Sequence, residues 1–158
     1  DVREGILALR TQVGTGRTLT GALKEYIAEY KHHLGPSTSV SESIPEDLDL
    51  TAGQEVQLPR IVQEALANAR QHARASEVTI EFTRGDDSTE VRVKDNGRGF
   101  NPIAIERGTW PHLGLQTMQE RAEAIGGVFE IESTPGSGTK VRVTVPHPPS
   151  VRTVGSEL

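Results

Sequence analysis

Four short segments in the second half of the chain alternate apolar and polar residues with a period of two. They cover residues 78–82, 91–93, 129–131 and 141–145. This period is typical of strands that have one face on a core and the other in water. The stretches GDDS at 85–88 and PGSG at 135–138 separate the first and the last pair, which predicts two hairpins. The chain is therefore constrained to an antiparallel sheet with one covered face.

Helical segments are expected to cover that face. One helix is predicted by apolar residues at steps of three and four, namely Leu19, Leu23, Tyr26, Ile27 and Tyr30, and Gly35-Pro36 ends it. A second is expected from about residue 54 to 72, and a third from about 113 to 125, before Gly126-Gly127. A short helix around residues 6–9 and a short strand around Val40 complete the prediction. The predicted fold is an α+β two-layer sandwich, with a mostly antiparallel sheet and helices on one face.

The composition excludes several classes of protein. A length of 158 residues suits one domain with a real core, and a net charge of −5 argues against a nucleic-acid partner. No apolar run approaches the roughly 18 residues of a membrane span. Cysteine is absent, which excludes disulfides and thiolate metal sites and fits a reducing cytoplasm. The first residue is Asp1, so we interpret the chain as a fragment of a longer protein.

Three polar residues, Glu64, Asn68 and His72, follow one another at steps of four in the second predicted helix. Each step rotates the position by only about 40°, so the three fall on one narrow stripe. That stripe borders the apolar one formed around Ile61 and Ala65. Taken alone, the stripe is more typical of a solvated helix edge, since most polar helical residues are exposed, although Asn in mid-helix is a weak helix former and favours a functional role slightly.

The string DNGRGF at 95–100 begins where the strand at 91–93 ends. Asp95 is thus expected at a strand terminus, followed by glycines that let the backbone approach a ligand. A carboxylate only accepts hydrogen bonds, so it suits the exocyclic amine of adenine and repels the carbonyl of guanine. An ordinary Asn-Gly turn is the other interpretation of this string.

Two more segments resemble nucleotide contacts. The loop from Asn101 to His112 ends at Gly114, which opens a helix, and backbone N–H groups at such an end suit a phosphate chain. Gly138 ends the last predicted turn and Thr139 follows it with a hydroxyl that suits a nucleotide. A plain connection and a tight hairpin explain these segments equally well.

The order of these signals resembles the GHKL ATPase superfamily, which includes histidine kinases, gyrase, Hsp90 and MutL. Within it, residues 58–146 are similar to histidine kinases paired with NarL-type response regulators. The strings that carry the resemblance are QEALAN at 63–68, DNGRGF at 95–100, LGLQTMQER at 113–121 and GSGT at 136–139. Four motifs in this order are highly specific.

The resemblance implies a Bergerat-type fold that binds ATP and Mg²⁺ and transfers phosphate to a histidine. Asp95 then reads adenine, Gly97 and Gly99 shape the pocket floor, and Thr139 supports Asp95 through a hydroxyl or a water. Asn68 is the implied Mg²⁺ ligand, since Mg²⁺ takes hard oxygen ligands and keeps several waters. His72, Gly114 and Leu115 are implied phosphate contacts. Glu64 is a candidate general base, a part that an acid beside the substrate histidine can also play.

The resemblance also divides the chain. Residues 1–16 are similar to the end of a dimerisation and phosphoacceptor region, residues 17–146 form the catalytic domain, and a disordered tail is expected at 147–158. The substrate histidine is expected before residue 1, in the phosphoacceptor domain of the same protein, with a response regulator downstream. The parent is expected to be a homodimer, while this fragment is compatible with a monomer. A cytoplasmic location is implied, and membrane attachment of the parent stays open.

Three other functions use the same pocket. They are a serine kinase of the anti-sigma-factor type, an ATP-driven conformational machine like gyrase or MutL, and a module that binds nucleotide without transferring phosphate. A phosphoacceptor helix encoded upstream excludes the first, and a transducer domain is required by the second. Nucleotide binding without transfer to a supplied histidine domain identifies the third.

Overall fold

Five strands form one sheet in the order β1-β2-β3-β5-β4. Their bounds are β1 (Ser39–Ser43), β2 (Glu77–Arg84), β3 (Ser88–Asp95), β4 (Val128–Thr134) and β5 (Gly138–Pro146). β1 pairs with β2 in parallel, and the other three pairings are antiparallel. The four alternating segments, both hairpins and the short strand around Val40 are thereby confirmed.

The computed structural model describes residues 19–34, 38–104 and 112–148, without the side chains of Leu34, Gln71, His72, His112 and Leu113. The helix expected at residues 6–9, the loop residues 105–111 and residues 149–158 of the expected tail lie outside this description. His147, which was expected to open that tail, donates its backbone N–H to the carbonyl of Asp87 at 2.9 Å.

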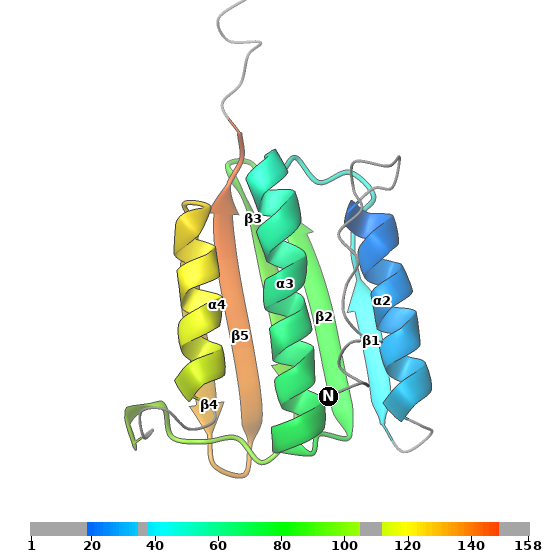
Figure 1. Cartoon of the computed structure of the whole chain (residues 1–158), viewed down its shortest axis with the longest axis vertical. Coiled ribbons are helices and arrows are strands. Elements are labelled where there is room, and N and C mark those ends of the chain that lie inside the picture. Colours follow the sequence, from blue (N-terminus) through cyan, green and yellow to red (C-terminus); the bar gives the residue numbers. More distant parts are fainter. Residues whose placement is uncertain (1–18, 35–37, 105–111, 149–158) are drawn as a thin grey trace, which may run out of the picture.

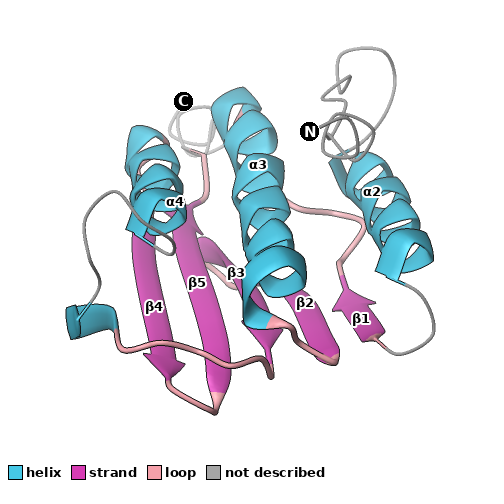
Figure 2. Cartoon of the chain, turned by 60° about the horizontal axis from the view of Figure 1, so that its bottom comes forward, coloured by secondary structure: helices cyan, strands magenta, loops and turns pink. Residues whose placement is uncertain are grey.

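Three helices lie on the same face of the sheet (Figures 1 and 2), namely α2 (Leu19–Leu34), α3 (Ala52–Asn68) and α4 (His112–Ala124). α2 lies over the β1 side, α3 over the middle and α4 over the β4 side. The predicted two-layer α+β sandwich is confirmed. None of the helices within the described ranges combines the length and apolar character that a bilayer crossing requires.

α3 begins with a capping box and ends differently from the prediction. Thr51 Oγ1 accepts from the N–H of Gln54 at 3.1 Å, and Gln54 Oε1 accepts from the N–H of Thr51 at 2.9 Å, which satisfies two of the free donors at this end. The sequence predicted one helix up to residue 72, but after Asn68 the chain continues as a π-helical turn, η2 (Ala69–Ala73).

The π-helical turn has a consequence for the predicted stripe. Arg74 has a φ of 53° and donates its N–H to the carbonyl of Ala69, five residues back, which is π-helical spacing. Because such a turn holds one more residue than an α-helical turn, the regular α-helical spacing that joins Glu64 and Asn68 ends at Asn68 and does not continue to residue 72. The spacing of apolar residues in the sequence does not show that this turn contains one more residue than an α-helical turn.

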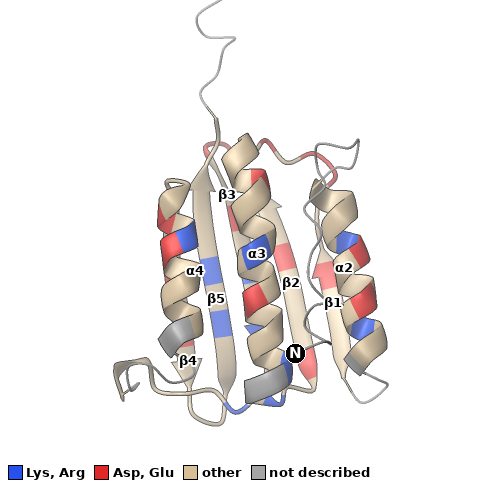
Figure 3. Cartoon of the chain, viewed as in Figure 1, with Lys and Arg blue, Asp and Glu red and all other residues tan. Residues whose placement is uncertain are grey.

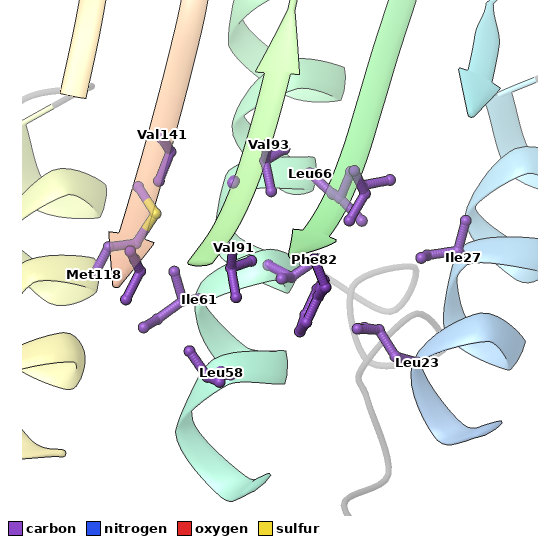
Figure 4. Close-up of a cluster of buried hydrophobic side chains, with 14 of the residues drawn as sticks. Leu23, Ile27, Leu58, Ile61, Leu66, Phe82, Val91, Val93, Met118 and Val141 are labelled. Atoms are coloured by element: carbon purple, nitrogen blue, oxygen red, sulfur yellow. The ribbon is translucent and has the colours of Figure 1, made fainter. Parts of the chain in front are cut away.

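The core lies between the helices and the sheet (Figure 4), and its side chains are aliphatic with few aromatics. Leu23 and Ile27 enter it from α2, and Leu58, Ile61 and Leu66 from α3; none of these is more than 1% exposed. Since all three helices bury their apolar stripes here, the helix face of the sheet is closed along most of its length.

The other face of the sheet carries a ladder of charges. Arg92 lies 2.9 Å from Glu90 and 3.5 Å from Glu81, and Arg142 lies 2.9 Å from Glu130. Lys and Arg colour the middle of β5, and Asp and Glu occur on the neighbouring strands (Figure 3). Exposed pairs of this kind contribute little stability each. They mark this face as the one that meets solvent.

Candidate functional site

Asp95 is the last residue of β3, and it lies between two neighbouring strands. It pairs with Val78 of β2 and with Thr139 of β5, and its side chain is only 8% exposed. Successive residues of a strand point to opposite faces, so Asp95 shares the helix-facing side with Val91 and Val93. The predicted place of Asp95 at a strand terminus is confirmed.

The carboxylate of Asp95 is held by backbone donors. Gly97 donates its N–H to Oδ1 at 2.8 Å, and the backbone N–H of Thr139 is a second donor. Burial raises the pKa of Asp95, and these two hydrogen bonds act against that rise without cancelling it. A carboxylate has about four acceptor positions, so two backbone donors leave capacity for a ligand donor.

The loop after β3 approaches the rest of the backbone so closely that only glycine fits. A Cβ on Gly97 would stand 2.4 Å from the carbonyl oxygen of Ala73, in η2. Gly99 has a φ of +61°, and a Cβ there would stand 2.2 Å from the carbonyl oxygen of Thr134. Arg98, between them, donates its N–H to the Ala73 carbonyl at 2.8 Å. The two glycines therefore let the loop pass between the end of α3 and the β4–β5 turn.

The first turn of α4 meets the polar stripe of α3. A Cβ on Gly114 would stand 3.1 Å from Nδ2 of Asn68 and 3.1 Å from Oε2 of Glu64. Glu64, Asn68 and Gly114, which the sequence analysis assigned to one site from two distant motifs, are therefore close enough to be in contact. Gly114 is the third residue of α4, so N–H groups that lack an intrahelical acceptor lie at this point.

Thr139 and Ser133 connect the site to the β4–β5 hairpin. The hydroxyl of Thr139 lies 2.8 Å from Oγ of Ser133, so its contribution to Asp95 comes from the backbone N–H. Ser133 also accepts from the N–H of Phe100 at 2.9 Å and donates to the carbonyl of Gly138 at 3.0 Å. The sequence analysis missed Ser133. Its signal is a polar residue at an inward position of β4, where Phe129 and Ile131 are apolar.

A pocket joins these residues at the end of α3. Its open space, including the mouth that faces solvent, is about 330 Å³. Its lining consists of Ala65, Asn68, Ala73, Val93, Asp95, Leu115, Met118, Thr139 and Val141. Its polar side chains come from two places in the fold, Asp95 and Thr139 from the paired strands β3 and β5, and Asn68 from the end of α3.

Not every predicted residue lines this pocket. Asn68, Asp95, Leu115 and Thr139 do, whereas Glu64 and Gly114 lie beside Asn68, and Gly97 lies beneath Asp95. The backbone of His72 lies in η2 next to Ala73, a lining residue. The apolar lining residues Ala65, Val93 and Val141 were expected only as core.

Asn96, the residue after Asp95, stabilises the loop that follows β3. Asn96 Oδ1 accepts from the N–H groups of Ser76 and Glu77 at 2.9 and 2.8 Å, which ties the loop to the start of β2.

The site offers few side chains that could bind a metal ion. Among the described residues no three His, Asp or Glu side chains gather at one point, and Asn68 is the side-chain oxygen donor that α3 contributes to the pocket wall.

The sequence of the chain matches a known protein family and several curated proteins. Residues 53–149 match the family described as "Histidine kinase-, DNA gyrase B-, and HSP90-like ATPase". The chain is 35% identical to the sensor histidine kinase LiaS of Bacillus subtilis over 146 residues, 92% of this chain and 39% of that protein. It is 34% identical to the sensor protein VraS of Staphylococcus aureus, over 92% of this chain and 40% of that protein. The chain thus spans about two fifths of the length of these curated relatives.

Solved structures have the same fold. The histidine kinase domain of the blue-light activated histidine kinase from Erythrobacter litoralis EL346 superposes with a TM-score of 0.66 at 24% identity, covering 82% of this chain and 61% of that one. The ATP binding domain of PrrB from Mycobacterium tuberculosis superposes with a TM-score of 0.62 at 26% identity, covering 80% of this chain and 93% of that one.

Proposed function

Because the chain belongs to the family of histidine kinase-, DNA gyrase B- and HSP90-like ATPases, we propose that it is the ATP-binding catalytic domain of a sensor histidine kinase. In this proposal the domain transfers the γ-phosphoryl group of ATP to a histidine of a phosphoacceptor domain, for relay to a response regulator. The names of the relatives support the kinase class, and the motif strings support the branch paired with NarL-type regulators. The parent homodimer and the boundaries at residues 16 and 146 belong to the same proposal.

The observation that carries the proposal is the buried carboxylate of Asp95 at the base of the pocket. Its two backbone donors hold it in one orientation, and its remaining acceptor positions suit the exocyclic amine of adenine. An acceptor-only group repels the carbonyl that guanine carries at the same position. Val93, Met118 and Val141 supply apolar surface beside it for a flat base.

The other end of the pocket suits phosphate groups and Mg²⁺. Asn68 offers the oxygen donor, and Mg²⁺ is ordinarily held by one or two protein oxygens together with substrate phosphates and waters. When bound, the ion neutralises phosphate charge. The amide groups at the start of α4, near Gly114 and Leu115, are proposed as phosphate donors, and His72 as a further contact.

Transfer itself requires little covalent chemistry from the protein. The acceptor nitrogen attacks the γ-phosphorus, the bond to the oxygen bridging to the β-phosphate breaks, and ADP leaves. The domain contributes by positioning and charge neutralisation. Glu64 lies beside Asn68 and Gly114 at the phosphate end, which supports a role as base or as an orienting acid.

Calorimetry with Mg-ATP and Mg-GTP tests the nucleotide assignment. We expect ATP to bind and GTP to bind much more weakly. Asp95→Asn should lose a charge-assisted hydrogen bond of roughly 1.5–3 kcal/mol, which corresponds to a loss of ATP affinity of about tenfold or more. Asp87→Asn is the matched control, since Asp87 is exposed and precedes β3, at the opposite end of that strand from Asp95. Equal affinity for both nucleotides, or an unchanged affinity in a folded Asp95→Asn protein, would contradict the proposal.

A further inference from the structure

Helix α2 makes a buried polar contact with helix α3 through Tyr30. The hydroxyl of Tyr30 donates to the backbone carbonyl of Leu66 at 2.6 Å, which is a short distance for an O–H···O hydrogen bond. Tyr30 is 1% exposed and Leu66 is 0% exposed. Water therefore does not compete for this bond, and the two helices are joined at one defined point.

That point lies directly beside the nucleotide pocket. Leu66 is two residues before Asn68, and its neighbour Ala65 lines the pocket. The N–H of Ala69 is shared between the carbonyls of Ala65 and Leu66, and the π-helical turn η2 follows at once. Tyr30 thus binds the last α-helical turn of α3 where the helix changes its hydrogen-bonding pattern.

The hydrogen bond from Tyr30 fixes the position of α3 along its axis more sharply than apolar packing does. Leu66 packs its side chain into the core (Figure 4), which fixes the face that α3 presents to the sheet. Apolar contacts are not directional, so they define the position of a helix along its axis less sharply than a hydrogen bond does. A short hydrogen bond to a backbone carbonyl is directional and resists movement along that axis.

We infer that Tyr30 is a positioning residue for the nucleotide site, which holds the Asn68 turn of α3 in place and links it to the position of α2. The inference rests on the proposed ATP site and extends it to a helix that the family match does not include, because that match begins at residue 53. A displacement of α2 would then change nucleotide affinity through Leu66.

The electrostatics of Tyr30 agree with this geometry. Burial strongly raises the pKa of the Tyr30 phenol, so the hydroxyl keeps its proton and remains a donor at all physiological pH values. The charge of Asp95 contributes to the same rise, which connects Tyr30 electrostatically with the adenine end of the pocket.

Thr20 provides a matched control on the same helix. Its hydroxyl is also buried, at 3% residue exposure, and it donates to a backbone carbonyl, that of Pro45, at 3.1 Å. Pro45 precedes α3 in a connection between elements. Thr20→Val and Tyr30→Phe each remove one buried hydroxyl bond of α2, but only the second removes a bond to α3.

The experiment measures Mg-ATP affinity by calorimetry and amide hydrogen exchange without nucleotide, in the 158-residue chain and both variants. Tyr30→Phe should weaken Mg-ATP binding by about twofold to tenfold, since one hydrogen bond can shift the binding-competent population by no more than that. It should also speed exchange at residues 67–73. Thr20→Val should do neither, and thermal unfolding checks that both variants are folded.

A double-mutant cycle with Asn68→Ala separates positioning from general destabilisation. If Tyr30 acts through the Asn68 turn, Tyr30→Phe should have a smaller effect on affinity when Asn68 is already removed. Additive effects, or equal effects of Tyr30→Phe and Thr20→Val, would overturn the inference. Absence of ATP binding in the unmodified chain would refute the proposed function instead. In that case unchanged exchange at residues 67–73 in Tyr30→Phe would still overturn the positioning role, and faster exchange there would support it.

Discussion

Asp95 is an acid in a position that penalises its charge. Because burial raises its pKa in the folded chain, the ionised carboxylate costs the fold stability. That cost is absent below the pKa of the unfolded chain and fully present above the raised folded pKa. The stability contribution of Asp95 therefore falls as pH rises through this interval.

We predict that Asp95→Asn has opposite effects on folding stability, which it increases at neutral pH, and on ATP affinity, which it lowers. In urea unfolding without nucleotide, the stability of the variant relative to the unmodified chain should increase as the pH rises above the ordinary pKa of an unfolded aspartate, because only the unmodified chain acquires the buried charge. Asp87→Asn, which removes one carboxylate at an exposed position, is the control. A relative stability that stays constant as the pH rises would mean that the site does not penalise the carboxylate.

Asn68 gives a second prediction at this scale. Asn68→Ala should weaken ATP binding chiefly when Mg²⁺ is present, because the side-chain oxygen is proposed to hold the ion. Calorimetry in Mg²⁺ and in excess chelator makes the comparison. An equal loss in both conditions would assign Asn68 a structural role in the pocket wall and remove the metal role.

At the scale of elements, the contact between the loop after β3 and η2 shapes the pocket floor. Gly97→Ala places a Cβ 2.4 Å from the Ala73 carbonyl, so the loop or η2 has to move. Overpacking of this kind costs typically about 1–3 kcal/mol of unfolding free energy, and we predict that ATP affinity falls as well. Gly53→Ala is the control, since the nearest side-chain atom to its Cβ is 3.7 Å away and α3 gains a better helix former there. Urea unfolding should show a loss for Gly97→Ala and a small gain for Gly53→Ala.

The elements also differ in how far the sequence predicted them. Strands β2 to β5 and both hairpins were predictable because a period of two and a turn sequence are local features. The end of α3 was not, because a π-helical turn depends on contacts such as the Arg98 N–H on Ala73, which come from a distant segment.

At the scale of the whole molecule, the nucleotide motifs are present without a histidine in the expected setting. None of the five histidines has an acidic residue directly beside it in the sequence. Positioning is most of the catalysis in phosphoryl transfer, and covalent linkage to the acceptor normally supplies a high effective concentration.

We therefore predict that this chain does not label itself with radioactive ATP and labels a separately supplied phosphoacceptor domain slowly. The transfer rate should rise with the concentration of that domain, and Asp95→Asn should reduce it. Stable, acid-labile label on the chain alone would show that the substrate histidine lies within these 158 residues.

Local patterns in the sequence predicted most of the helices and strands and the order of the motifs. Alternation of apolar and polar residues predicted the strands, and the glycines at 97 and 99 indicated a close backbone approach. The four motif strings indicated an ATPase of this family.

The tertiary structure alone decided which of these residues meet. Strand order sets Thr139 against Asp95, the start of α4 brings Gly114 to Glu64 and Asn68, and Tyr30 reaches Leu66 across 36 residues of sequence. Such pairings are made by side chains and backbones far apart in the chain. Bringing these residues together lowers the chain entropy, and only formation of the shared core compensates for this loss. No local sequence pattern therefore encodes these pairings.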